Sequence, residues 1–192
     1  MRTVKEPDVR RQEILDGAIK VFAKKGYEKT SISDIAKALN ISQGLCYRYF
    51  SSKEEIYDAA LKKYASMIAH ENLHITNFDQ PIRDTIDAIT GSMEIYKDAE
   101  KKDPELYNVF HFGSSSKKLH DDLFFMTAKT LVPFIQEMLR KAKERGEISI
   151  EDTDGIAIVT IYGWVGLYLA AEMTDEERLK VWRSMLYKLL DL

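Results

Sequence analysis

The stretch ISQGLCYRYFSSK, residues 41–53, gathers side chains that can bind a polyanion. If residues 43–49 form a short helix, Ser42 can cap it, and the unpaired N–H groups at its start favour phosphate. Gln43 can read a base edge through paired hydrogen bonds, with adenine as the typical partner. Gly44 leaves the backbone bare, so that DNA can approach closely. The stretch therefore predicts a helix that reads duplex DNA.

The tyrosines and cations that follow extend this chemistry. Tyr47 lies one turn beyond Gln43, where its ring can touch a thymine methyl group and its hydroxyl can reach a phosphate. Arg48 and Tyr49 are expected to point toward the flanking DNA backbone. Lys53 lies in the first turn of the next helix, where the helix dipole disfavours a cation unless an anion arrives. Each residue alone has an ordinary explanation as packing residue, cap or solvated charge, but their joint order favours DNA binding.

A helix-turn-helix over residues 32–50 is the element that can hold the short helix outward. The sequence SISD, residues 31–34, approximates a capping box that opens a helix ending near Leu39. Ala36 is small enough for a close helix crossing, and Asn40 tolerates a left-handed turn. Two apolar residues are expected to close the underside: Ile41 and Leu45.

Helical periodicity recurs along the chain and no strand pattern persists, so the predicted fold class is all-α with about nine helices. Asp8 is expected to cap the first helix and Gly26 to end it, while SSKE at 51–54 matches a second capping box. Pro133 is expected to interrupt and kink its helix. The expected helices span about 9–25, 32–39, 43–49, 52–74, 81–101, 104–113, 119–145, 154–172 and 175–190.

Charge and composition limit the class of protein. Residues 1–63 hold 13 Lys and Arg against 9 Asp and Glu, whereas residues 64–192 hold 15 against 22. A basic head on an acidic body can orient a molecule toward phosphates, although ordinary surface charge gives the same counts. The single cysteine, Cys46, and an N-terminus without an apolar signal core fit a cytoplasmic protein. Residues 155–171 are uncharged, and their length is at the lower limit for a membrane-spanning helix. Their acidic flanks favour a buried helix instead.

The first third of the chain resembles a known family. The run at 14–60 resembles the DNA-binding domain of the TetR (tetracycline-repressor-like) transcriptional regulators, with F-x-x-x-G-Y at 22–27 and Y-x-Y-F-x-S-K-E at 47–54. Asn40 replaces the usual glycine of the turn, and Cys46 replaces a larger apolar residue, commonly leucine. The resemblance implies DNA contacts from ten residues: Thr30, Ser31, Ser33, Ser42, Gln43, Gly44, Tyr47, Arg48, Tyr49 and Lys53.

The resemblance also implies how the whole chain works. Residues 1–52 would form an N-terminal three-helix DNA-binding domain, and residues 53–192 a C-terminal helical domain for ligand binding and dimerisation. The implied function is a ligand-responsive, sequence-specific regulator. A homodimer would repress from a palindromic operator and be released by a small hydrophobic molecule. The implied protein is not an enzyme, and no cofactor, metal or membrane is expected.

The residues of the C-terminal part indicate where ligand and partner would bind. The aromatic middle of the chain favours an apolar pocket. Its candidate lining residues are Tyr96, Tyr107, Phe110, His111, Phe124, Phe125 and Trp164. The last two helices suit a two-fold interface, although they could instead complete the core of one monomer. The candidate interface residues are Gly163, Gly166, Trp182, Met185, Leu186 and Leu189.

An enzyme is the main alternative, although the sequence has no Gly-rich phosphate loop and no nucleophile elbow. An acid–base site could be assembled only from residues that any helical surface offers: His111, His120, Asp121 and Asp122. His70 and His74 share a helix face and could bind a metal, but a third ligand is missing nearby. A redox role for Cys46 would need a lowered pKa, for which Arg48 is the one nearby cause.

Overall fold

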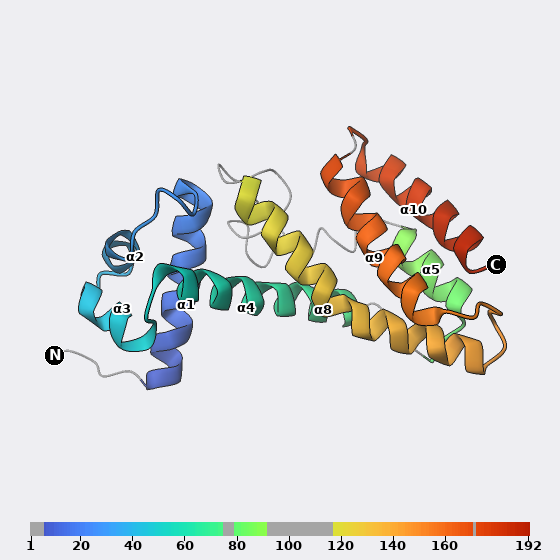
Figure 1. Ribbon diagram of the computed structural model, residues 1–192, viewed down its shortest axis with the longest axis horizontal. Coiled ribbons are helices and arrows are strands. Elements are labelled where there is room, and N and C mark those ends of the chain that lie inside the picture. The colour runs from blue at the N-terminus through green and yellow to red at the C-terminus, as the bar shows by residue number, and fades with distance from the viewer. Residues whose placement is uncertain (1–5, 75–78, 92–116, 171) are drawn as a thin grey trace. The chain divides into compact units, whose positions relative to one another are not determined.

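The computed structural model describes residues 6–74, 79–91, 117–170 and 172–192 (Figure 1). Over these ranges the chain is helical and contains no strand, which confirms the predicted all-α class. The eight helices of the described residues are α1 (Pro7–Lys25), α2 (Ile32–Ala38), α3 (Gln43–Tyr49), α4 (Lys53–His74), α5 (Ile82–Thr90), α8 (Lys117–Glu144), α9 (Thr153–Ala170) and α10 (Asp175–Leu189).

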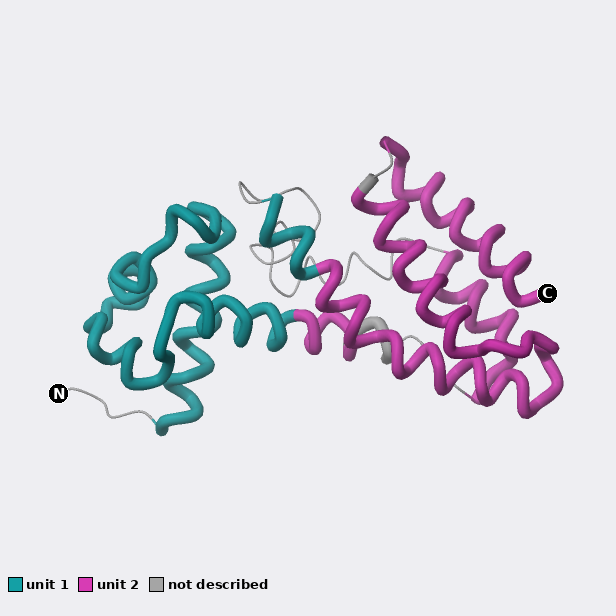
Figure 2. Tube along the Cα trace, in the orientation of Figure 1, with its two compact units in different colours: residues 1–64, 103–123 teal, residues 65–102, 124–192 magenta. Residues whose placement is uncertain are grey.

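The chain divides into two compact units, coloured separately in Figure 2. Unit 1 comprises residues 1–64 and 103–123, and unit 2 comprises residues 65–102 and 124–192. Both α4 and α8 therefore contribute residues to each unit.

The core of unit 1 forms where α1 crosses the helix-turn-helix. The inward face of α1 is apolar at helical spacing, and it buries Ile14, Leu15, Ala18, Ile19 and Phe22. From α2, Ile35 and Ala36 are buried against it. The position that demands a small residue is Gly17, because a Cβ atom there would lie 2.5 Å from a methyl carbon of Leu39. The close packing of Leu39, at the end of α2, against α1 thus depends on a glycine of α1.

Helix ends in unit 1 correct two predictions and confirm two others. Asp8 does not cap α1: the helix starts at Pro7, whose fixed φ suits the first turn, and no side chain caps it. The cap of α4 is Ser52, one residue later than predicted, with its hydroxyl accepting from the amide of Glu55 at 3.1 Å. Gly26 ends α1 with φ 79°, as predicted. The capping box at 31–34 is also present.

Unit 2 packs α5, the C-terminal part of α8, α9 and α10 around one main core. Its central members are Ile86, Leu139, Ala157, Trp182 and Leu186. A smaller cluster joins Ala128 of α8 to Ile161 and Val165 of α9. At its start α10 has a capping box between Thr174 and Glu177, with the Glu177 amide donating to the Thr174 hydroxyl at 3.2 Å.

Two predicted helix boundaries in the part of the chain after α4 need correction. The helix α8 runs through Pro133 without ending, since proline removes only one hydrogen bond and this proline is exposed. The helix α5 ends at Thr90 rather than near residue 101, because Gly91 follows it. The predicted helix at 104–113 lies outside the described residues.

The uncharged stretch of α9 raised the question of a membrane helix. Among the described helices, none combines the length and apolar character needed to cross a bilayer.

Candidate nucleic-acid interface

The short helix α3 is held by caps and a turn that its own sequence encodes. The Ser42 hydroxyl accepts a hydrogen bond from the Leu45 amide at 3.2 Å, as predicted for the cap. Asn40 has φ 53°, the left-handed turn expected of it. The Ile41 amide donates to the carbonyl of Ala36 at 2.9 Å and so closes the turn onto α2. These contacts fix the direction of α3 relative to α2.

The outer face of α3 is exposed. Cys46 is the buried residue of this helix, whereas 52% of the Tyr47 surface is accessible. At Gly44 an added Cβ atom would meet no atom within 4 Å, so unit 1 does not need glycine there for packing. A bare backbone that its own fold does not require suits close approach by another molecule.

The predicted contact residues fall into three groups by exposure. Six of them are exposed: Ser31, Ser42, Gln43, Gly44, Tyr47 and Arg48. Three are partly exposed: Ser33, Tyr49 and Lys53. Thr30 differs, because it is only 3% exposed and its hydroxyl donates to the Gly26 carbonyl at 2.7 Å.

The start of α2 is tied to the end of α1 by a charged cluster. The Lys25 ammonium donates to Asp34 Oδ1 at 2.7 Å, and the Ser31 hydroxyl donates to Asp34 Oδ2 at 2.7 Å. The hydrogen bond from Lys25 first, and then those from Ser31, hold the pKa of the Asp34 carboxyl well below its usual range. Asp34 is therefore ionised at neutral pH and fixes the capping hydroxyl of Ser31.

Lys53 has a partner within unit 1. Its ammonium donates to the Tyr27 carbonyl at 2.8 Å and lies 4.2 Å from the centroid of the Tyr27 ring. A cation at this first position of α4 is opposed by the helix dipole, and the carbonyl and ring offset that cost. No local pattern in the sequence indicates this pairing, because it joins residues 26 positions apart.

Cys46 faces the interior of unit 1. Its accessible surface is 0%, and burial raises the pKa of its thiol. A buried, protonated thiol is a poor nucleophile.

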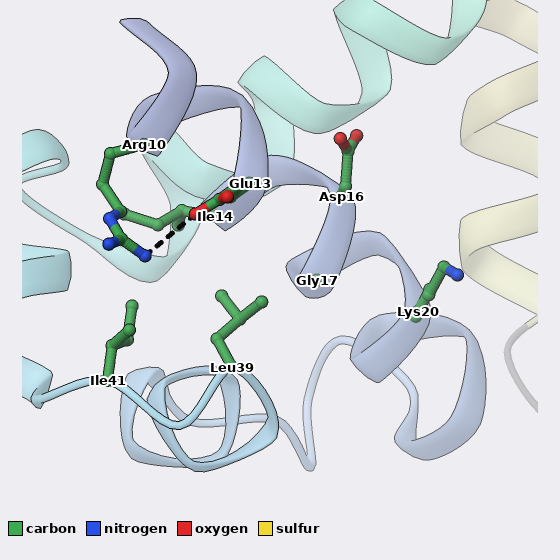
Figure 3. A pocket seen from close by; sticks show the side chains of 8 residues that line it. All are labelled: Arg10, Glu13, Ile14, Asp16, Gly17, Lys20, Leu39 and Ile41. Carbon is green, nitrogen blue, oxygen red and sulfur yellow. Dashed lines mark hydrogen bonds and ion pairs between the residues drawn. The ribbon is translucent and has the colours of Figure 1, made fainter. Parts of the chain in front are cut away.

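A groove of about 420 Å³ lies between α1 and the turn after α2 (Figure 3). Leu39 and Ile41 form its apolar part, and charged side chains of α1 form its rim. Two of these charged side chains pair with each other, since the Arg10 guanidinium donates to the Glu13 carboxylate at 2.8 Å. Asp16 accepts from Lys63 and, at 2.8 Å, from the Tyr64 hydroxyl.

The candidate ligand residues lie partly beyond what the structure describes. Tyr96, Tyr107, Phe110 and His111 fall outside the described residues. In unit 2, Phe124 stacks on Tyr168 with ring centroids 4.5 Å apart. The ring centroids of Trp164 and Trp182 are 4.7 Å apart. Phe125 is half exposed, and its ring centroid lies 6.3 Å from that of Tyr162.

The alternative metal and acid–base sites find no support among the described residues. No group of three or more metal-ligating side chains gathers within the described ranges. His70 is exposed, and the side chain of His74 lies outside the description. His120 contacts the neighbouring Asp121 at 3.3 Å, while Asp122 instead accepts from the Tyr57 hydroxyl.

The candidate interface residues of the last two helices occupy different places. Trp182 and Leu186 are buried in the core of unit 2. Gly163 lies beneath Met185, whose methyl carbon would be 3.2 Å from an added Cβ atom. Gly166 is exposed and has open space around it. The exposed apolar residues of α9 and α10, which the sequence analysis did not name, are Ile158, Val159, Tyr162 and Val181.

A short exposed helix, capped at its start and fixed by a tight turn against a second helix, defines a helix-turn-helix DNA-binding protein. Residues 14–60 match the family model described as "Bacterial regulatory proteins, tetR family". This match confirms the resemblance to the TetR transcriptional regulators that the sequence indicated.

Relatives of known description cover most of the chain. The biofilm operon icaADBC negative transcriptional regulator IcaR of Staphylococcus aureus is 26% identical over 95% of this chain and 97% of its own length. The transcriptional regulator LuxR of Vibrio harveyi is 28% identical over 77% of this chain and 71% of its own length.

Solved structures share the fold over nearly the full length. FadR from Bacillus subtilis, solved with stearoyl-CoA, has a TM-score of 0.63 and 19% identity, and the match covers 93% of this chain and 97% of FadR. A TetR-family regulator from Mesorhizobium loti has a TM-score of 0.66 and 16% identity. The match covers 97% of this chain and 98% of the regulator from Mesorhizobium loti. At these identities the likeness establishes the fold.

Proposed function

We propose that the protein is a ligand-responsive repressor that binds a palindromic DNA operator as a homodimer. The observation that carries this proposal is the exposed outer face of α3, with a bare backbone at Gly44 and an accessible Tyr47 ring. A major groove admits one helix, and two such helices in a dimer would read two half-sites.

The DNA-contacting residues divide into readers and backbone anchors. Gln43 and Tyr47 would contact base edges, because both are exposed near the start of α3. Ser42, Arg48 and Lys53 would bind phosphates. Thr30 would act indirectly by fixing the turn after α1, because its hydroxyl is buried and already donates to Gly26.

The two functions would occupy successive parts of the chain. Residues 1–52 would bind DNA, and residues 53–192 would bind the effector and form the dimer. The match of residues 14–60 to the tetR regulatory family supports placing the DNA-binding part first.

The dimer would form through the exposed apolar face of α9. Ile158 is 44% accessible and Val159 is 53% accessible, and Tyr162 and Gly166 follow at helical spacing. Isolated exposed apolar side chains are ordinary, but several on one helix face mark an interaction surface. Gly166 leaves room there for a second helix. Trp182 and Leu186 would support the interface from within the core.

The effector would be a small, mainly hydrophobic molecule bound in unit 2. The stacked pair of Phe124 and Tyr168 and the pair of Trp164 and Trp182 offer aromatic lining. The indole N–H of Trp182 is buried without a hydrogen-bond partner among the described residues. Such a group costs about 1–3 kcal/mol, so a polar atom on an effector at this place would be stabilising.

The protein would act by binding alone, in the cytoplasm, without catalysing a reaction. An operator on genomic DNA is the partner that the α3 face requires, and a cytoplasmic regulator reaches it directly.

Selection of bound sequences from a random duplex pool, using the purified full chain, tests the DNA-binding proposal. A symmetric consensus with two half-sites about one helical turn apart is expected. Recovery of no consensus, or of one without symmetry, would contradict the dimeric repressor.

Intrinsic fluorescence tests the effector proposal. The chain has two tryptophans, Trp164 and Trp182, and both lie in the proposed effector region. Stearoyl-CoA is a suitable first probe, because the structurally similar FadR was solved with it. Quenching together with release of the selected duplex would support an acyl effector, and release without any fluorescence change would place the effector elsewhere.

A further inference from the structure

Two tyrosines of unit 1, which lie outside the helix-turn-helix of residues 32–50, form an aromatic platform. Tyr27 lies in the turn after α1, Tyr57 lies on α4, and their ring centroids are 4.6 Å apart. Phe22 of α1 meets the Tyr57 ring edge-on at 5.1 Å. Tyr57 is only 4% exposed, so the platform (Tyr27 and Tyr57) is anchored in the core.

Two lysines from helices far apart in the sequence lie over this platform. Lys53, at the start of α4, lies 4.2 Å from the Tyr27 centroid and donates to the Tyr27 carbonyl. Lys118, in the first turn of α8, lies 5.6 Å from the Tyr27 centroid and 5.1 Å from the Tyr57 centroid. Cations within about 6 Å of a tyrosine face are attracted to it. The platform therefore connects α8 to the residue that we assign to phosphate binding.

A carboxylate locks α8 onto the platform. Oδ2 of Asp122 accepts a hydrogen bond from the Tyr57 hydroxyl at 2.7 Å, and the same oxygen accepts from the Lys118 ammonium. Burial, followed by the hydrogen bond to Asp122, raises the pKa of Tyr57, so its hydroxyl remains a donor at neutral pH. Asp122 thus fixes both the ring of Tyr57 and the position of Lys118.

We propose that Lys118 and Asp122 are positioning residues for DNA binding, which act through the tyrosine platform to hold Lys53 ready for a phosphate. An ammonium has three donors, and the Tyr27 carbonyl occupies one of them in the described contacts. The direction of the other two N–H donors of Lys53 depends on the position of Tyr27, because the Tyr27 carbonyl holds the ammonium in place. The inference rests on the proposed function and extends the DNA-binding machinery to a helix outside the helix-turn-helix.

The direction in which Asp122→Asn changes the affinity for DNA distinguishes a positioning role from a simple effect of charge. Asp122→Asn removes a negative charge, which by charge alone would strengthen binding to DNA. If Asp122 positions Lys53, the same substitution should weaken binding, by about three- to tenfold. Asp121→Asn is the matched control, because it removes the same charge from the adjacent position, where the described contact is to His120. The control is expected not to weaken binding.

The experiment measures the Kd of the full chain for the selected duplex by fluorescence anisotropy at several salt concentrations. Lys53→Ala should weaken binding to all duplexes and lower the magnitude of the salt slope by about one. Adding Asp122→Asn to Lys53→Ala should then cause no further loss, because the positioned group is gone.

A second variant tests the same contact in case Asp122→Asn does not fold. Tyr57→Phe deletes only the hydroxyl that donates to Asp122, without changing charge, and is expected to weaken binding in the same direction. Circular dichroism melting shows whether each variant is folded at the assay temperature, and Tyr57→Phe replaces Asp122→Asn if the latter is not.

Three results have distinct meanings. Unchanged or tighter binding by Asp122→Asn, or an equal loss in the Lys53→Ala background, overturns the positioning role while the repressor stands. Lys53→Ala without effect in a chain that binds the duplex also overturns the inference. A wild-type chain that selects no duplex overturns the proposed function itself.

Discussion

Tyr47 on α3 and Tyr162 on α9 are both exposed tyrosines, with 52% and 37% of their surfaces accessible. Their neighbours differ in kind. Beside Tyr47 lie an amide and a guanidinium, those of Gln43 and Arg48. Beside Tyr162 lie Val159 and other aliphatic side chains. Hydrogen-bonding neighbours suit a hydrated, charged groove, and aliphatic neighbours suit a dry protein interface.

The two helices also differ in what they contribute to their own unit. The helix α3 has seven residues and buries Cys46, so packing explains little of its sequence. The helix α9 has 18 residues and buries Ala157, Ile161 and Val165 while exposing apolar residues on another face. A helix that is apolar on more than one face needs more than one packing partner. We therefore expect α3 to meet DNA and α9 to meet a second copy of the chain.

The largest effect is expected from a charge on the α9 face. Val159→Asp would bury a carboxylate in the dimer interface and weaken the dimer by about 3 kcal/mol or more. Sedimentation velocity should show a monomer at micromolar concentration. Val9→Asp on α1 is the matched control, because Val9 is 51% accessible and Val159 is 53% accessible. A dimeric Val159→Asp would exclude this face as the interface.

The next effect is expected at Tyr47. Tyr47→Ala should weaken operator binding by about 1–3 kcal/mol and broaden base preference, because both ring and hydroxyl contacts are lost. Anisotropy titrations against the selected duplex and single-base variants of it measure both quantities. Tyr47→Phe, which keeps the ring, should retain the base preference. Equal binding by wild type and Tyr47→Ala would exclude the groove assignment.

Two glycines with open surroundings allow opposite tests of the two surfaces. Gly44→Ala should raise stability by about 0.5–1 kcal/mol, because alanine favours helix and meets no atom within 4 Å. It should nevertheless weaken operator binding by about 1 kcal/mol or more, because a methyl group obstructs a close interface. Gly166→Ala should leave operator contacts intact and weaken the dimer instead. Thermal melting, anisotropy and sedimentation separate these outcomes. Stronger DNA binding by Gly44→Ala would contradict the close approach.

The smallest effect concerns Cys46, which has no place in either surface. Burial raises the pKa of its thiol, so the neutral form favours the folded state. Its contribution to stability is present below the pKa of the unfolded thiol and is lost as pH rises through the folded pKa. At pH 8, iodoacetamide should modify the native chain at least about tenfold more slowly than the unfolded chain. Rapid native modification would revive a sensing role.

The sequence predicted unit 1 better than unit 2 because its signals there are local. The caps at Ser31 and Ser42, the left-handed Asn40 and the terminating Gly26 each depend on neighbours a few residues away. The cap of α4 was placed one residue early, since Ser51 and Ser52 are adjacent alternatives with a glutamate three residues ahead of each.

In unit 2 the apolar residues of α9 and α10 could not be assigned to core or interface from spacing alone. Trp182 and Leu186 have the same periodicity as a dimer face, yet they pack in the core beside α5. The exposed Val159 and Tyr162 follow a similar pattern on the other side. Spacing identifies faces of a helix, but only the neighbouring helices decide which face is covered.

By itself the sequence determined the all-α class, the helix-turn-helix and the chemistry of α3, because these follow from helical periodicity, local capping and residue type. Tertiary structure decided that Gly17 receives Leu39, that Lys53 rests on Tyr27, and that Asp122 holds Tyr57. Each of these contacts joins residues that are more than 20 positions apart. Packing and hydrogen bonding act through space, and the order of residues along a chain does not specify which distant groups will meet.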